Sequence, residues 1–226
     1  MKVLDLGIAP YTQVQELQKR LRLAVLEERL DGTLLMLEHP PVITLGKHAS
    51  TDDIVDLLGA TRRGLQIVRS ERGGQSTLHA PGQLVAYPVV PVPRRNLRAY
   101  VQDLEEVVVR LLAKYHLTGA RVDGRPGVYV KKRKIASVGL RCQNGVTSHG
   151  TALNVSLDLT LFDLITSCGD PLLKQTSVES ETGLAYPMSE TKSAYTEAFA
   201  EVFGLALVTT AKVPWENVEG FLGLRA

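Results

Sequence analysis

Apolar residues recur every three or four positions in two long segments of the chain, which predicts two amphipathic helices. The first segment spans residues 11–30, where Gln, Lys, Arg and Glu separate the apolar positions Val14, Leu17, Leu21 and Val25. The second spans residues 100–115, where charged side chains lie off a longer apolar stripe. We also expect a helix over residues 194–205 and brief helical turns over 52–58 and 161–165.

Short apolar runs bounded by Gly, Pro or Asp predict β-strands between these helices. The expected strands cover residues 33–39, 42–45, 66–69, 84–90, 147–157 and 206–210. Residues 127–140 indicate a hairpin whose turn is the basic run 131–134. Strands come in groups with helices at intervals, so we expect an α+β fold in which helices pack on a mixed, largely antiparallel sheet. No repeat or linker divides the chain, so residues 1–226 are expected to form a single domain.

Composition and charge exclude several classes of protein. A chain of 226 residues, 44% of them hydrophobic, is long enough to bury a core without disulfides. A net charge of +2 gives no indication of a nucleic-acid partner. The N-terminal segment does not resemble a signal peptide, and no apolar run approaches the ~18 residues of a membrane span. With only two cysteines, the chain is expected to be cytoplasmic and reduced.

The polar, glycine-rich stretch Arg72–His79 precedes an apolar strand and is the first candidate ligand site. Its two adjacent glycines permit a close approach of the backbone to a ligand. The stretch is not a phosphate-binding P-loop, because no Lys-Ser or Lys-Thr follows at the required spacing, and it lacks the GxGxxG pattern. Two interpretations stay open: a tight hairpin with Pro81-Gly82 at its corner, or the wall of a ligand site. A lone histidine such as His79 is more often structural.

The two cysteines have different sequence surroundings. Cys168 follows a helical turn and lies in a loop between Ser and Gly, which makes it a candidate nucleophile. A free cysteine is nevertheless more often a small buried hydrophobe. Cys142 lies at a strand end and is interpreted as structural or incidental.

A lysine and a histidine-glycine pair complete the candidates. Two interpretations of Lys134 stay open. A lysine in a basic turn is normally solvated, but alternation along the returning hairpin strand places Lys134, Ala136 and Val138 on one face, where Lys134 would point inward while its basic neighbours stay at the turn. His149 and Gly150 lie inside a strand pattern, where glycine often marks the close approach of a ligand.

Together these segments resemble the lipoyl(octanoyl)transferase family, also called lipoate-protein ligase B. The matching residues run in family order over roughly residues 30–185: Glu38-His39-Pro40-Pro41-Val42, Gly46, Arg72-Gly73-Gly74, Thr77, His79, Pro81-Gly82-Gln83, Gly127-Val128, Lys134-Ile135-Ala136, Gly139, His149-Gly150, Ala152-Leu153-Asn154, Asp158-Leu159, Phe162, Ile165 and Cys168-Gly169. Two positions depart from the family pattern, since Ala80 replaces a glycine and Ser167 replaces a proline.

The resemblance implies an acyltransferase with the fold of biotin- and lipoate-protein ligases. It would move an octanoyl group from octanoyl-acyl carrier protein to a lysine of lipoyl domains, in 2-oxoacid dehydrogenase complexes and in glycine cleavage H protein. Cys168 would carry the acyl group as a thioester, with Lys134 as its partner and His149 as a candidate aid to proton transfer. The implied substrate-binding residues are Arg72, Gly73, Gly74, Gln75, Ser76, Thr77, Leu78, His79, Ser137, Val138, Gly139, Gly150, Thr151 and Ala152. No ATP or metal is implied, because the acyl chain arrives as a thioester on the carrier's phosphopantetheine.

A cysteine-lysine pair is chemically sufficient for such a reaction. The attacking species is a thiolate, and a free cysteine, with a pKa near ~8.5, is only a few per cent ionised at pH 7. An ammonium about 4 Å away stabilises the thiolate by up to ~4 kcal/mol at an effective dielectric constant of ~20. Small residues along the implied site, Gly73, Gly74, Gly139, Gly150 and Ala152, are expected to leave a narrow slot for the chain. The basic turn 131–134 is expected to attract acidic carrier domains.

Three other functions remain open from the sequence. An ATP-dependent lipoate-protein ligase would share the fold but would not need Cys168. A cysteine hydrolase would pair Cys168 with His79 or His149. A non-catalytic acyl- or lipoyl-binding module would need neither. We expect a monomer, because no long apolar stripe is left over after the core is assigned.

Overall fold

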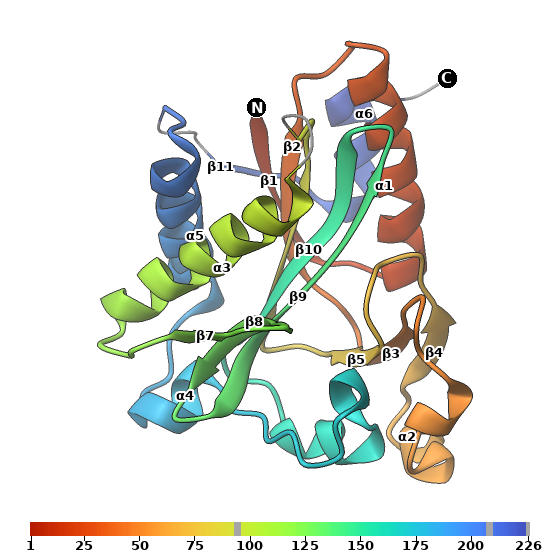
Figure 1. The fold of residues 1–226 in the computed structure, drawn as a ribbon. Helices are drawn as coiled ribbons and strands as arrows, with labels where there is room; N and C mark the ends of the chain where they lie inside the picture. The colour runs from red at the N-terminus through yellow and green to blue at the C-terminus, as the bar shows by residue number, and fades with distance from the viewer. Residues whose placement is uncertain (93–95, 207–209, 225–226) are drawn as a thin grey trace.

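In a computed structural model, the chain forms an eight-stranded mixed sheet with helices on both faces and a three-stranded sheet beside it (Figure 1). The structure describes residues 1–92, 96–206 and 210–224. In spatial order the large sheet comprises β11 (Thr210–Lys212), β1 (Lys2–Ile8), β2 (Thr33–Glu38), β6 (Gln83–Val89), β10 (Val146–Asn154), β9 (Arg133–Gln143), β8 (Arg125–Val130) and β7 (Ala120–Val122). Strands β11, β1 and β2 are parallel and the other neighbours are antiparallel, as the strand grouping predicts.

The small sheet comprises β4 (Gln66–Arg69), β3 (Val42–Leu45) and β5 (Ser76–His79). Strand β3 is parallel to β4 and antiparallel to β5. Short elements surround it: η1 (Thr51–Asp53), α2 (Leu57–Arg62), η2 (Leu159–Leu164) and η3 (Ser167–Gly169). Their apolar side chains form a separate buried cluster that includes Ile43, Leu78 and Phe162. This layer supports one side of the candidate site.

Helices α3 (Leu97–Lys114) and α5 (Met188–Phe203) cover one face of the large sheet, and α1 (Tyr11–Leu26) and α6 (Val218–Leu222) cover the other (Figure 1). The predicted stripes are the buried faces; Leu104, Val107 and Leu111 of α3, for example, are inaccessible to solvent. The remaining short helices are α4 (Val178–Thr182) and η4 (Trp215–Asn217). Within the described residues, none of the helices has the length and apolarity needed to cross a membrane.

The expected helices exist, but their ends differ from the predicted ones. Helix α3 begins three residues early because the Asn96 side chain caps it by accepting from the Ala99 amide. Helix α5 begins at Met188, and α1 ends at Leu26. The turn expected over 52–58 is divided into η1 and α2, because Asp56 caps α2. The strand expected over 206–210 falls largely on residues 207–209, outside the described residues, and β1 was not predicted at all.

The hairpin of β8 and β9 contains a bulge that the hydrophobic pattern does not reveal. Tyr129 pairs with Lys134 but Val128 pairs with Ala136, so β9 has one extra residue at this point. Opposed residues of antiparallel strands share a face, so Ala136 lies with Val128 in the core beneath α3, whereas Lys134 lies with Tyr129 on the opposite face. The expectation that Lys134, Ala136 and Val138 share one face is therefore wrong: Ala136 and Val138, between which the register is regular, lie on the core face, and Lys134 lies on the other.

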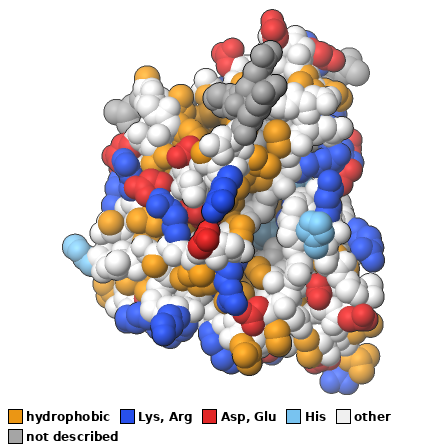
Figure 2. Space-filling model, viewed as in Figure 1, with side chains coloured by type: hydrophobic (Ala, Val, Ile, Leu, Met, Phe, Trp, Pro, Cys, Tyr) orange, Lys and Arg blue, Asp and Glu red, His pale blue; other side chains and the backbone are white. Residues whose placement is uncertain are grey.

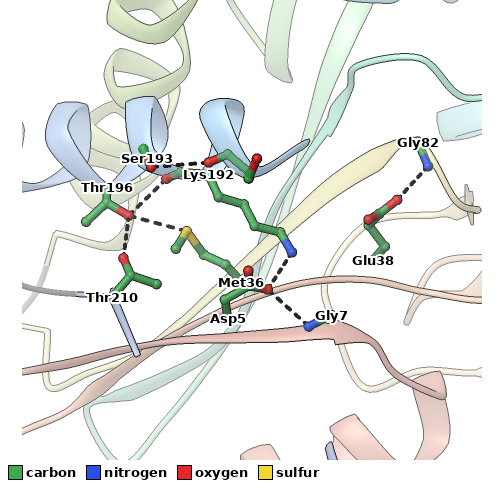
Figure 3. Close-up of polar contacts among 10 residues, drawn as sticks. Asp5, Gly7, Met36, Glu38, Gly82, Lys192, Ser193, Thr196 and Thr210 are labelled. Atoms are coloured by element: carbon green, nitrogen blue, oxygen red, sulfur yellow. Dashed lines mark hydrogen bonds and ion pairs between the residues drawn. The ribbon is translucent and has the colours of Figure 1, made fainter. Parts of the chain in front are cut away.

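Figure 3 shows polar contacts that join β1 to α5 and β2 to the corner before β6. Lys192 of α5 forms a nearly buried ion pair with Asp5 of β1. On the other side of this view, the Glu38 carboxylate accepts a hydrogen bond from the Gly82 amide at 2.8 Å. Gly82 has φ +87°, and a Cβ there would lie 2.6 Å from the Leu157 nitrogen, so only glycine fits this corner. Ala80 is not among the residues with positive φ and is buried in the apolar cluster of the small sheet, so alanine fits there without strain.

Candidate active site

A cleft of about 590 Å³ opens where β5, β8, β9 and β10 meet η3. Its volume lies in the range of about 300–1,000 Å³ that is usual for small-molecule sites. The walls come from segments that are far apart in the sequence: the loop before β5, the hairpin of β8 and β9, the middle of β10, and residues 168–171 and 173. The glycine-rich stretch thus forms one wall of a cleft. The hairpin interpretation is wrong, because β5 pairs with β3 in the small sheet, whereas β6 pairs with β2 and β10 in the large one.

Lys134 and Cys168 face each other across the cleft. The Lys134 Nζ donates to the Cys168 Sγ at 3.2 Å and to the Pro126 carbonyl oxygen at 2.9 Å. Lys134 is 3% exposed, whereas Cys168 is accessible. The Lys134 backbone bonds to the Lys174 carbonyl and the Thr176 amide, which ties β9 to the chain that follows Cys168. A buried ammonium beside an accessible sulfur stabilises the thiolate and leaves it free to react.

Cys168 adopts the left-handed backbone conformation, with φ 55° and ψ 22°. Gly169 follows with φ +69°, and a Cβ there would overlap the side-chain amide of Gln75. The left-handed region costs an L-residue roughly 1–2 kcal/mol, so the turn presents the sulfur to the cleft at some expense in stability.

We therefore expect Cys168→Gly to be more stable than Cys168→Ala by about 1 kcal/mol, because glycine relieves this strain. Both variants lack the thiol, so the comparison isolates the backbone. Urea unfolding at pH 7 measures the difference. Equal midpoints, with equal slopes, would show that the left-handed conformation is not strained here.

The predicted substrate-binding residues lie together, with one exception. The cleft is lined by Arg72, Gly73, Gly74, Gln75, Ser76, Thr77, His79, Ser137, Val138, Gly139, His149, Gly150, Thr151 and Ala152. Leu78 does not line it, because strand alternation turns its side chain into the apolar cluster of the small sheet. Gly150 was expected to make room for a ligand, but the structure gives another reason for it. A Cβ there would lie 2.2 Å from the Ala86 oxygen, so this glycine lets β10 approach β6.

Arg72 is a buried cation in the cleft wall. Its guanidinium donates to Thr44 Oγ1 and to the carbonyl oxygens of Thr44 and Gly73, and no carboxylate within the described residues forms an ion pair with it. The acid nearest the sulfur in sequence, Asp170, is paired with Arg125 at 2.9 Å. Lys134 and Arg72 therefore leave the cleft with a positive potential, which favours a thiolate or an oxyanion.

Two of the basic side chains in the turn 131–134 are held in ion pairs. Lys131 and Arg133 both pair with Glu181, whose side chain is buried, at 3.4 and 2.6 Å. Figure 2 shows Lys and Arg side chains interspersed with Asp and Glu over the face in view, not one continuous basic surface. The attraction of acidic carrier domains by this turn stays a prediction. It would rest mainly on Lys132, because Lys131 and Arg133 are paired with Glu181.

Three histidines and two tyrosines form a buried aromatic cluster at the inner wall of the cleft: Tyr11, His39, His79, Tyr87 and His149. His39 Nδ1 must donate to the Ala9 carbonyl oxygen, so its Nε2 accepts from the Tyr87 hydroxyl at 3.0 Å. Gln83 uses its amide nitrogen as a donor elsewhere, so its oxygen accepts from His79 Nδ1 at 2.7 Å. These contacts fit neutral imidazoles.

Burial lowers the pKa of all three imidazoles. The pKa of His39 falls from 6.5 to about 4, and that of His149 to about 3, where Arg72 adds a second lowering effect. The pKa of His79 is also well below 6.5, by desolvation first. Such imidazoles are weak proton acceptors at pH 7. Assistance by His149 stays a prediction, and it would start from the neutral ring.

Sequence reasoning missed several residues of the cleft. Tyr129 and Pro126 line it, and the Lys134 Nζ lies 5.7 Å from the centroid of the Tyr129 ring. Burial raises the pKa of Tyr129 to about 12, so its hydroxyl is neutral. Residues two apart in a strand share a face, so Tyr129 lies on the same face of β8 as Gly127. Its place in the cleft follows once its pairing with Lys134 is known. Within the described residues, no group of three or more His, Cys, Asp or Glu side chains is arranged to hold a metal ion.

Comparisons with known proteins place this geometry in a family. The model of the lipoyl protein ligase A/B catalytic domain matches residues 10–200. The octanoyltransferase of Desulfovibrio desulfuricans is 43% identical over 203 residues, covering 88% of this chain and 85% of that protein. The chain belongs to the octanoyltransferase family. It is accordingly an acyltransferase, as the sequence motifs indicate.

Solved structures show the same fold at low sequence identity. A lipoate-protein ligase A bound with ATP superposes with a TM-score of 0.76 at 16% identity, covering 99% of this chain and 94% of that one. A biotin protein ligase from Aquifex aeolicus in complex with biotin and ATP gives a TM-score of 0.56 at 16% identity, covering 90% and 70%. The expected fold is thus confirmed for this octanoyltransferase family member.

Proposed function

We propose that this chain transfers an octanoyl group from octanoyl-acyl carrier protein to a specific lysine of lipoyl domains through a thioester on Cys168. The acceptors are the lipoyl domains of 2-oxoacid dehydrogenase complexes and glycine cleavage H protein, and residues 1–226 act as one catalytic domain. The observation that carries the proposal is the 3.2 Å contact between Lys134 Nζ and Cys168 Sγ in a cleft sized for a small ligand.

The first half-reaction forms the acyl-enzyme. The Cys168 thiolate attacks the carbonyl carbon of the donor thioester, and the oxyanion forms in the positive potential of Lys134 and Arg72. The bond between that carbon and the phosphopantetheine sulfur then breaks. The Lys134 ammonium gives its proton to the departing sulfur, which leaves as a neutral thiol.

The second half-reaction reverses these roles. The neutral amine of the acceptor lysine attacks the Cys168 thioester, and Lys134, now an amine, takes the proton that the new amide must lose. The carbon-sulfur bond breaks and Cys168 leaves as a thiolate beside a regenerated ammonium. No charge or proton is left over. The acyl group is activated throughout, so ATP and metal have no step to perform.

Two rival functions are less well supported. A hydrolase would need a histidine base beside Cys168, but burial keeps the pKa of His79 and His149 well below neutrality and Lys134 occupies the hydrogen-bonding position at the sulfur. An ATP-dependent ligase would share this fold, as the ATP-bound lipoate-protein ligase A does. That reaction would give no reason for a lysine-paired thiol. We place the reaction in the cytoplasm, where both free cysteines stay reduced.

Mass spectrometry tests the proposal. After mixing with octanoyl-acyl carrier protein and no ATP, we expect one octanoyl group on the Cys168 peptide and none on Cys142. Addition of a lipoyl domain should remove it and modify one lysine of that domain. Cys168→Ala should give neither product, whereas Cys142→Ala should behave as the parent. Lack of any adduct from pH 6 to 9, or transfer that requires ATP, would overturn the proposal.

A further inference from the structure

One peptide unit connects Lys134 to a buried carboxylate on helix α3. The carbonyl oxygen of Pro126 accepts from Lys134 Nζ at 2.9 Å. The amide of the same peptide bond, Gly127 N–H, donates to Glu105 Oε1 at 2.7 Å. A continuous series of hydrogen bonds therefore connects Glu105 to Lys134 through this peptide, and Lys134 to Cys168.

Glu105 is an unusual residue for its position. It is 6% exposed on the apolar face of α3, among residues that pack on the sheet. Buried carboxylates are rare unless they are paired, and its nearest cation, Arg121 Nε, lies 3.8 Å from its other oxygen and outside the core. Arg121 also pairs with the neighbouring Glu106. The hydrogen bond from the Gly127 amide to Glu105, at 2.7 Å, is shorter than the ion pair between Arg121 and Glu105.

Gly127 provides independent support that this peptide is built around the lysine. Its φ of +129° is a conformation that L side chains rarely adopt. A Cβ there would lie 2.4 Å from the Ala136 carbonyl oxygen, 2.6 Å from Lys134 Cε and 3.2 Å from Nζ, so the glycine lets β8 lie against both the strand β9 and the lysine. Gly127 pairs with Ser137 in the β8–β9 ladder, and its amide is also held from outside the hairpin by the Glu105 carboxylate.

We propose that Glu105 is a positioning residue for the reaction: by holding the Gly127 amide it orients the Pro126 carbonyl, which in turn holds the Lys134 ammonium against the Cys168 sulfur. The inference rests on the proposed role of Cys168 as acyl acceptor. Hydrogen bonds in such a chain polarise one another, so the carboxylate also strengthens the carbonyl as an acceptor.

Two conservative substitutions at Glu105 separate the effect of side-chain length from the effect of side-chain charge. Glu105→Gln keeps an acceptor oxygen at the same distance but removes the charge. Glu105→Asp keeps the charge but retracts it by one methylene, out of reach of the Gly127 amide. A positioning role predicts that the Asp variant is impaired and the Gln variant is close to the parent. A role through charge alone predicts the reverse order.

The assay is alkylation of Cys168 by iodoacetamide, followed on its own peptide in a Cys142→Ala background. It needs no acyl donor, so it reports on the thiol even if the proposed transfer is wrong; an octanoyl adduct measured in parallel reports on the transfer. The charged and titratable groups facing the thiol are Lys134, Arg72, Tyr129 and the pair of Arg125 with Asp170, and Arg121 faces Glu105. None of these is altered in the single variants Glu105→Gln and Glu105→Asp.

For Glu105→Asp we expect the pH of half-maximal alkylation to rise by about one unit, with up to tenfold slower alkylation at pH 7. The decisive control is the same substitution in Lys134→Met, where its effect should vanish because Glu105 acts through that lysine. Glu106→Asp perturbs the same arginine and should change nothing. If Glu105→Asp leaves the pH profile unchanged, or slows alkylation equally with and without Lys134, the proposal is wrong. Thermal unfolding shows whether each variant is folded.

Discussion

Replacing Lys134 with methionine is expected to lower octanoyl transfer at pH 7 by about 10³-fold or more. Two losses combine to give this figure. Without the ammonium, the attacking sulfur and the oxyanion lose the cation that lies 3.2 Å from the sulfur and stabilises their negative charge. The variant also loses the group that protonates the departing thiol and deprotonates the acceptor amine, worth about 10²–10⁴-fold. Methionine keeps most of the volume of a side chain that is 3% exposed.

Single-turnover formation of the octanoyl adduct and steady-state transfer to a lipoyl domain measure the two losses. Lys212→Met is the matched control, because it removes the same charge from an exposed position on β11, an edge strand that does not line the cleft. The defect of Lys134→Met should shrink as the pH rises toward 9, since the thiol then ionises unaided. Transfer within tenfold of the parent at pH 7 would exclude Lys134 from the chemistry.

Much of this site could be predicted from the sequence, because short motifs carry its chemistry. The glycine-rich stretch, Lys134, Gly150 and Cys168 are recognisable by type and order, and folding brings them to one cleft. The long helices could also be predicted, since the stripe of α3 has one period over its whole length. Their boundaries depended on caps such as Asn96, which are single hydrogen bonds that periodicity does not detect.

The rest depended on long-range geometry. The bulge opposite Val128 reverses the face of Lys134 relative to Ala136, and nothing local in the basic turn signals it. Glu105 reads as one charge in an amphipathic helix, and only the fold places its carboxylate against the Gly127 amide. Strand β1 was missed because it contains both Asp5 and Gly7, two poor strand formers, and is stabilised by parallel pairing with distant segments.

Acidification from pH 7 to pH 5 is expected to destabilise the fold by about 4 kcal/mol through His39 and His149 alone. The pKa of these imidazoles is lower in the folded protein, about 4 and about 3, than the ordinary value of 6.5. Below pH 6.5 the unfolded chain therefore binds protons at these histidines that the folded chain does not bind. This contribution is fully present above pH 6.5 and is lost as the pH falls toward the folded values, at about 2 kcal/mol for each histidine by pH 5. His79 acts in the same direction.

Urea unfolding at pH 7 and pH 5 measures this loss, and His39→Gln isolates one part of it. Other groups titrate over the same range, so the informative quantity is the change in unfolding free energy between the two pH values, compared between variant and parent. That change should be smaller by about 2 kcal/mol in His39→Gln, because glutamine does not titrate. The exposed His48 gives the control substitution, His48→Gln, which should leave it unaltered. If the unfolding free energy fell equally between pH 7 and pH 5 in all three proteins, burial would not be what keeps His39 neutral. If the loss follows the buried histidines, decay of transfer below pH 6.5 reflects unfolding around the cleft, and the catalytic pair itself has to be studied above that pH.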